Sequence, residues 1–197
     1  MSPEAIWNAQ LQDVQCAVAW VRANAEQYRV DTTRIALMGR SAGAHLALEA
    51  AYRPNDATVD LAACGMAGVD TSVSAVVAFY PPTDLRMWDS TPEGALAALL
   101  GGLPADMPDV YADASPTEFV RDDLPPTLLL QGYMDDLVVP AHVELLHNLL
   151  LATNTPVVVL RVPWARHGFD FLIGGLGAQM VEYDIDRFLA WSFYRID

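Results

Sequence analysis

The chain has 197 residues, of which 53% are hydrophobic, and it carries a formal net charge of −14 at pH 7. This length suits one domain with a sizeable buried core, and the charge argues against a nucleic-acid partner because phosphates would be repelled. No apolar run approaches the roughly 20 residues that span a membrane. The first residues carry no basic segment followed by an apolar stretch, so we expect no signal peptide and a cytoplasmic protein.

The expected elements alternate between helices and strands along the chain. Residues 9–27 have the apolar spacing of an amphipathic helix. Four short apolar runs then indicate buried strands, at 34–38, 75–80, 127–131 and 157–162, with further helices at 42–53, 141–152 and 177–194. Continuous apolar strands between helices are typical of a mostly parallel sheet covered on both faces. We therefore expect a single α/β domain over residues 1–197.

Residues 84–123 interrupt this alternation. The segment contains four prolines and only one expected helix, near residues 93–100. It is too long for a simple connection, so we expect a lid-like insertion or a pocket wall.

The two cysteines, Cys16 and Cys64, do not have the spacing of metal ligands. Cys16 lies among the apolar residues of the first helix, where a buried free thiol is expected. The sequence predicts neither a metal site nor a cofactor.

A serine at a strand-to-helix turn is the most informative feature of the sequence. A short apolar strand ends in Gly39-Arg40-Ser41-Ala42-Gly43, and an alanine-rich helix follows at once. A serine on so tight a turn adopts strained backbone angles, so the residues two before and two after it must be nearly free of side chain. The turn presents the hydroxyl above the edge of the sheet, where the first N–H groups of the helix face any oxyanion that forms. Ser41 is therefore the candidate nucleophile, and a glycine-rich turn with an idle serine is the alternative.

A nucleophilic serine needs a base, and the base needs an acid that fixes its tautomer. In an α/β sheet such groups sit in loops at the carboxyl ends of strands. Asp135 and Asp136 follow the third strand, and His167 follows the fourth. Because successive residues point apart, only one of the two aspartates can face His167, and this reasoning leaves the choice open.

Three other histidines compete for the role of base. His45 lies one turn along the helix from Ser41, so its side chain should pack beside the turn. His142 and His147 fall in a helical segment and are expected at the surface. His167 is preferred because it lies in a loop directly after a strand, with a glycine beside it.

Several motifs in register extend this interpretation. They are Asp31-x-x-Arg34-Ile35-Ala36, Gly39-Arg40-Ser41-Ala42-Gly43-Ala44-His45-Leu46-Ala47, Phe79-Tyr80-Pro81-Pro82-Thr83-Asp84-Leu85, Leu124-Pro125-Pro126-Thr127-Leu128-Leu129, Gly132-x-x-Asp135-x-Leu137-Val138-x-Pro140 and His167-Gly168-Phe169-Asp170. Together they resemble the esterase and lipase branch of the α/β-hydrolase superfamily, near its hormone-sensitive-lipase-like and acetyl-esterase-like groups, over about residues 5–195. The resemblance implies a three-layer α/β-hydrolase fold with Ser41 as nucleophile, His167 as base and Asp135 as acid. Asp135 is chosen because the family's aspartate follows its glycine by three positions, whereas Asp136 fits a variant counted back from the proline.

The chain departs from the family at its start. The family places a block of strands before the first helix, and a His-Gly-Gly-Gly type loop of that block supplies part of the oxyanion hole. No such motif occurs here, so the resemblance implies an N-terminally truncated fold in which only the Ala42 N–H can be assigned as an oxyanion donor. The strand before Ser41 then becomes an edge that is open to pairing with another chain, and self-association is expected.

The implied function is a serine hydrolase that cleaves small carboxylic esters through an acyl-enzyme intermediate. The alternatives are a catalytically weak or inactive fragment or pseudoenzyme of the same fold, or a peptidase or thioesterase, because a triad does not choose the leaving group. Trp88 and Trp164 are candidates for the lining of an acyl pocket, with ordinary packing as the alternative.

Overall fold

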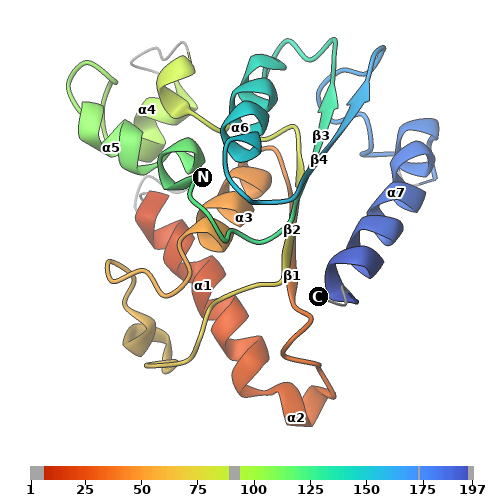
Figure 1. Cartoon of the computed structure of the whole chain (residues 1–197). Coiled ribbons are helices and arrows are strands. Elements are labelled where there is room, and N and C mark those ends of the chain that lie inside the picture. The colour runs from red at the N-terminus through yellow and green to blue at the C-terminus, as the bar shows by residue number, and fades with distance from the viewer. Residues whose placement is uncertain (1–6, 89–93, 173, 195–197) are drawn as a thin grey trace.

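A four-stranded parallel sheet forms the centre of the molecule (Figure 1). The computed structural model describes residues 7–88, 94–172 and 174–194. Its strands are β1 (Ala36–Arg40), β2 (Ala75–Phe79), β3 (Thr127–Gly132) and β4 (Val157–Val162), and they lie side by side in chain order. Every neighbouring pair is parallel, so the expected parallel sheet is confirmed. All four carboxyl ends therefore meet at one edge of the sheet, where the loops that carry the candidate residues begin.

Helices cover both faces of this sheet and make the three layers (Figure 1). α3 (Ala42–Tyr52) and α6 (Ala141–Leu151) pack on one face, where Leu48 and Leu146 are fully buried against Val76 and Leu129. α7 (Leu176–Phe193) lies on the other face. The central strands β2 and β3 are buried along their whole length because both of their sides are covered. The three-layer α/β-hydrolase fold is the observed fold.

The first expected helix is divided in two. α1 (Trp7–Ala23) is followed by the short α2 (Ala25–Tyr28), which Arg29 ends in a left-handed conformation at φ 55°. α1 packs on α3 and, through Trp7 and Leu11, on part of the 84–123 segment. None of the helices among the described residues is both long enough and apolar enough to cross a bilayer.

The 84–123 segment holds more helix than the sequence predicts. The expected helix is present as α4 (Ala95–Leu100), although residue 93 lies outside the described residues. In addition there are η2 (Leu85–Met87), α5 (Pro108–Asp113) and η3 (Pro116–Phe119). Proline opens two of these elements, at a position where its missing N–H costs nothing because the first N–H groups of a helix have no intrahelical acceptor. The helix content of the 84–123 segment is therefore higher than its four prolines suggest.

The same segment is anchored to the body of the fold through Arg53. Its guanidinium donates to the Asp113 carbonyl at 3.0 Å and lies 4.2 Å from the centre of the Phe119 ring. It also donates to the side chains of Asp56 and Glu49, and it lies 3.4 Å from the carboxylate of Asp113. Three carboxyl side chains therefore surround one cation. Burial raises the pKa of Glu49 to about 8, against the lowering effect of Arg53.

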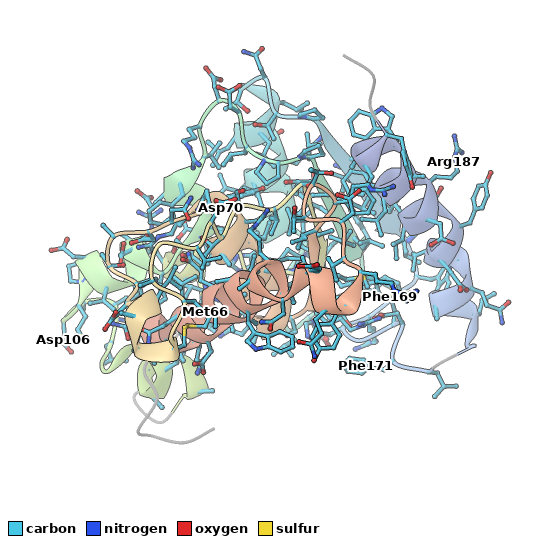
Figure 2. All side chains as sticks on the ribbon, turned by 90° about the horizontal axis from the view of Figure 1, so that it is seen from below. Met66, Asp70, Asp106, Phe169, Phe171 and Arg187 are labelled. Carbon is cyan, nitrogen blue, oxygen red and sulfur yellow. A yellow bond between two sulfur atoms is a disulfide. The ribbon has the colours of Figure 1, made fainter. Side chains whose placement is uncertain are left out.

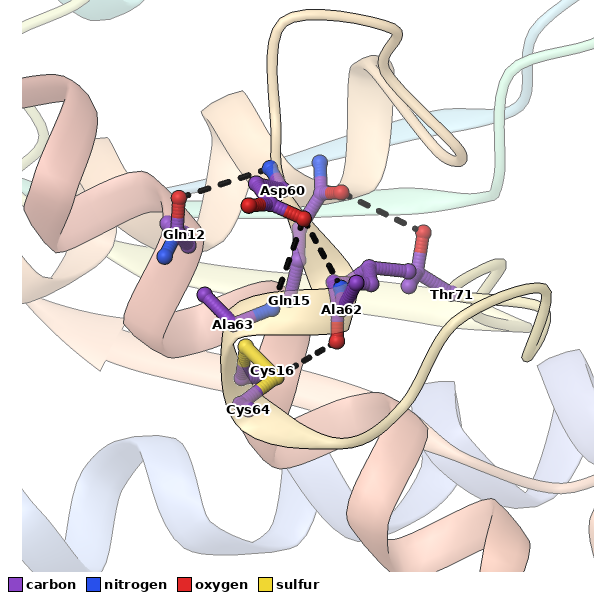
Figure 3. Close-up of a disulfide and its surroundings, with 9 residues drawn as sticks. Gln12, Gln15, Cys16, Asp60, Ala62, Ala63, Cys64 and Thr71 are labelled. Atoms are coloured by element: carbon purple, nitrogen blue, oxygen red, sulfur yellow. Dashed lines mark hydrogen bonds between the residues drawn. A yellow bond between two sulfur atoms is a disulfide. The ribbon is translucent and has the colours of Figure 1, made fainter.

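The expectation of a free thiol at Cys16 is wrong, because Cys16 forms a disulfide with Cys64 (Figure 3). The two cysteines are 48 residues apart in sequence. The chain after α3 returns across α1 and makes the one-turn helix η1 (Leu61–Cys64), which Asp60 caps by accepting from two backbone N–H groups. Nothing in the local sequence patterns marks this return, and it brings the second cysteine onto the first.

β1 is an edge strand, as expected: among the described residues it pairs with β2 alone. Its Met38 side chain is 54% exposed. A groove of about 320 Å³ lies beside this strand, between Met38 and Arg40 on one side and Val181 and Ile185 of α7 on the other. The loop that leads into α7 carries Phe169, which packs on the core, and Phe171, which is exposed (Figure 2). Apolar surface is therefore open at this edge.

Candidate active site

Ser41 is held in strained backbone angles between β1 and α3, with φ 54° and ψ −121°. Its N–H donates to the Phe79 carbonyl at 2.9 Å, which ties the turn to the neighbouring strand. A Cβ on Gly39 would lie 2.1 Å from the Gly43 carbonyl oxygen, so the need for glycine at position 39 is confirmed. A Cβ on Gly43 would meet nothing within 4 Å, so crowding does not explain that glycine.

A chain of two hydrogen bonds joins the three expected side chains. The Ser41 hydroxyl lies 2.9 Å from His167 Nε2, and His167 Nδ1 lies 2.8 Å from Asp135 Oδ2. A carboxylate only accepts, so Nδ1 carries the proton and Nε2 is left to accept from the serine. The histidine side chain is 15% exposed and the aspartate side chain is fully buried. The structure thus brings together all three residues, which are far apart in the sequence.

The choice between the two aspartates is decided by their surroundings. The other oxygen of Asp135 accepts from the backbone N–H groups of Leu137 and Val138, at 3.0 and 2.9 Å. Gln131 adds a longer contact of 3.4 Å to the oxygen that faces His167. Asp136 instead points into solvent, where it pairs with Arg166 at 2.8 Å. Only Asp135 is oriented toward the imidazole.

Ala42 is the first residue of α3 and is exposed. The first N–H groups of a helix have no acceptor within the helix, and the positive end of the helix dipole adds to their attraction for an anion. The Ala42 N–H therefore lies at the start of α3 directly after Ser41, and its role as an oxyanion donor stays a prediction.

The remaining histidines do not reach the serine hydroxyl. His45 is buried beside the turn and its Nε2 bonds to the Ala114 carbonyl at 2.7 Å, as expected, and burial lowers its pKa. The expectation of a surface position for His142 is wrong, because its side chain is buried and Nδ1 accepts from the Thr83 N–H at 3.2 Å. α6 turns this histidine toward the loop after β2, and burial lowers its pKa. His147 remains partly exposed on the same helix.

The two tryptophans named as pocket candidates have different surroundings. The Trp88 ring centre is 6.0 Å from that of His142, which places it beside the loop after β2. Trp164 is half exposed, three residues before His167. Both positions are compatible with a pocket wall.

A buried ionic group beside His167 was not expected. Asp170 lies three residues after the histidine, and its side chain is 2% exposed. It accepts from Arg40, the residue before Ser41, and from the Tyr80 hydroxyl at 2.7 Å. The available signal was an acidic residue between two phenylalanines, Phe169 and Phe171, of which Phe169 packs on the core and Phe171 is exposed. An ionised side chain in such a place is expected to have a cationic partner.

Within residues 7–88, 94–172 and 174–194, no three histidine, cysteine, aspartate or glutamate side chains gather as they would around a metal ion.

The parallel sheet with helices on both faces and a serine on the first strand-to-helix turn define an α/β hydrolase. Residues 1–150 match the family described as BD-FAE, and the protein belongs to that family.

Three known proteins illustrate the likeness. LipM of Mycobacterium tuberculosis, described as a probable carboxylic ester hydrolase, is 33% identical over 195 residues, which cover 96% of this chain and 44% of LipM. A solved structure described as a truncated form of a carbohydrate esterase from gut microbiota superposes with a TM-score of 0.85 at 28% identity, covering 98% of this chain and 71% of the other. An acetyl ester-xyloside bifunctional hydrolase from Caldicellulosiruptor lactoaceticus gives 0.79 at 25% identity, with 95% and 68% covered. The chain thus spans less than half the length of LipM.

Proposed function

We propose that this protein is a serine hydrolase that cleaves small carboxylic esters through an acyl-enzyme intermediate. The observation that carries the proposal is the continuous hydrogen-bond chain from Ser41 through His167 to Asp135. The relatives support the proposal. LipM is described as a probable carboxylic ester hydrolase, and the two solved structures are described as a carbohydrate esterase and an acetyl ester-xyloside bifunctional hydrolase.

The reaction proceeds in two halves. Ser41 Oγ attacks the ester carbonyl while His167 Nε2 takes the hydroxyl proton, and the resulting imidazolium is stabilised by Asp135 on Nδ1. The tetrahedral oxyanion collapses, the bond to the alcohol breaks, and His167 gives its proton to the leaving oxygen. Water then attacks the acyl-enzyme with the same histidine as base, which releases the acid and restores Ser41.

The oxyanion of each tetrahedral intermediate is stabilised by the Ala42 N–H. One such donor contributes about 10²–10³ to the rate in a serine hydrolase. A second donor belongs, in the family, to a glycine-rich loop absent from this sequence. A weakly active or inactive chain is therefore the second candidate function.

Short acyl esters are expected to be the preferred substrates, because the 84–123 segment, which the sequence predicts to be a lid or pocket wall, is modest in size. Turnover of p-nitrophenyl acetate and butyrate should exceed that of p-nitrophenyl esters with long chains. An acetylated sugar belongs in the same series, since both solved relatives carry carbohydrate-related titles. Faster hydrolysis of long-chain esters contradicts the substrate class, and preferential cleavage of amides or thioesters favours the peptidase or thioesterase alternative.

We also propose that the isolated chain self-associates through β1. This strand offers an unpaired edge and the exposed Met38 side chain, and such an edge pairs readily with another strand. Light scattering after size exclusion should show a mass that rises with protein concentration. Met38→Lys should lower that mass, because a charge on an edge strand opposes pairing.

Leu151→Lys is the matched control, since Leu151 is an exposed apolar residue at the far end of α6. It should leave the association unchanged. A chain that stays monomeric at every concentration, or that responds equally to both lysines, contradicts the edge as the site of association.

The cytoplasmic location expected from the sequence stays a prediction. The disulfide between Cys16 and Cys64 weighs against it, because disulfides persist mainly in oxidising compartments.

A further inference from the structure

Asp170 connects the two loops that must meet for catalysis. One of its oxygens accepts from Arg40, which ends β1 directly before Ser41, and the other accepts from Tyr80, which follows β2. Asp170 itself lies on the loop of His167. One buried carboxylate thus joins the nucleophile turn, the end of the neighbouring strand and the histidine loop.

Tyr80 contacts both Asp170 and the imidazole of His167. The centre of its ring is 4.4 Å from that of His167, so the ring supports one face of the histidine. Tyr80 is fully buried and holds φ at 38°, a left-handed conformation that costs free energy in a residue other than glycine. Burial and the hydrogen bond to Asp170 raise the pKa of its hydroxyl well above the usual range, so the hydroxyl stays protonated and donates.

Arg40 links Asp170 to the turn that carries Ser41. Its guanidinium lies 4.7 Å from the centre of the Phe79 ring, and its pairing with Asp170 leaves no unpaired charge in the buried carboxylate. Because Arg40 and Ser41 are adjacent in the chain, the ion pair between Arg40 and Asp170 ties the histidine loop to the serine turn.

We infer that Asp170 is a positioning residue for the triad, acting through Arg40 on Ser41 and through Tyr80 on His167. It does not touch the reacting atoms. The inference rests on the proposed function for its catalytic consequence, while the geometry of His167 can be tested without activity.

Asp170→Asn removes the charge that pairs with Arg40, and Tyr80→Phe removes the hydroxyl but keeps the ring. We expect Asp170→Asn to lower kcat about 10²-fold, the loss that accompanies a displacement of a reacting group by about 1 Å. Tyr80→Phe should lower kcat about tenfold, since the ring still supports the imidazole. KM should not change in either variant. The double variant should be little worse than Asp170→Asn alone, because the two residues act as one unit.

Tyr52→Phe is the matched control. Tyr52 is a fully buried tyrosine whose hydroxyl bonds to Thr127 Oγ1 at 2.9 Å in the core under α3. This variant also loses one buried tyrosine hydrogen bond, and it should keep the wild-type kcat even if its melting temperature falls.

The second readout is the proton on His167 Nδ1, followed by NMR. In the wild type the buried Asp135 should protect it from exchange with water, giving a low-field signal that disappears in His167→Ala. The signal should broaden or vanish in Asp170→Asn and persist in Tyr52→Phe. Wild-type kcat and an unchanged signal in Asp170→Asn and Tyr80→Phe overturn the inference, as do equal losses in Tyr52→Phe. If the wild type shows no Ser41-dependent hydrolysis, the proposed function fails, and the NMR signal alone decides the positioning role.

Discussion

Replacing Ser41 by alanine is expected to remove nearly all hydrolysis of p-nitrophenyl acetate, with kcat/KM lower by about 10⁴-fold or more. His167→Ala should produce a loss of similar size. The serine supplies the attacking oxygen and the histidine supplies the base 2.9 Å from it, so neither residue retains its catalytic role without the other. Combining the two substitutions should add little to either single loss, because members of a triad act as a unit.

Two controls separate this effect from general damage to the fold. Ser74→Ala deletes a partly exposed serine whose hydroxyl donates to the Thr33 carbonyl, and His147→Ala deletes a partly exposed histidine on α6. Both should hydrolyse the ester at the wild-type rate. Full activity in Ser41→Ala would contradict the assignment of Ser41 as the nucleophile.

Asp135→Asn should lower kcat by about 10⁴-fold, whereas Asp136→Asn should leave it near the wild-type value. The buried Asp135 carboxylate accepts a hydrogen bond from His167 Nδ1–H, and an amide at this position can turn its donor toward that nitrogen. The imidazole would then carry its proton on Nε2, where it cannot accept from Ser41. Because the carboxamide has the shape of the carboxylate, the two backbone N–H groups on its other oxygen should keep the loop folded.

Asp136→Asn is matched to this variant in chemistry and differs by one position. It breaks only an exposed ion pair with Arg166, which contributes little to stability. A larger loss in Asp136→Asn than in Asp135→Asn would transfer the role of acid to Asp136.

The main elements of the fold could be predicted because each strand is a short apolar run between helical patterns. The expected strand at 34–38 lies at 36–40 and the last helix begins one residue early, at Leu176. Such shifts at element ends are normal, since local patterns decide the type of an element better than its limits. The helices of the 84–123 segment were missed because proline at a first turn starts a helix as readily as proline in its interior breaks one.

The meeting of Ser41, Asp135 and His167 could be predicted because each lies in the segment that follows a strand of a parallel sheet. The fold brings these segments to one edge, while the catalytic roles of the three residues stay a prediction. Asp170 and the Cys16–Cys64 disulfide have no such local mark. Asp170 meets Arg40 across 130 residues, and the disulfide depends on the path of a loop, so each contact appears only once the chain is folded.

Covalent labelling by a fluorophosphonate tests the central claim most directly, because it needs an activated serine and no knowledge of the substrate. Ser41 Oγ attacks phosphorus, fluoride leaves, and His167 takes the proton, so one label should be found on the peptide that carries Ser41. Asp135→Asn should slow the labelling strongly, and Ser74→Ala should not. Absence of label on the folded wild-type chain, or a label on any other residue, contradicts the account.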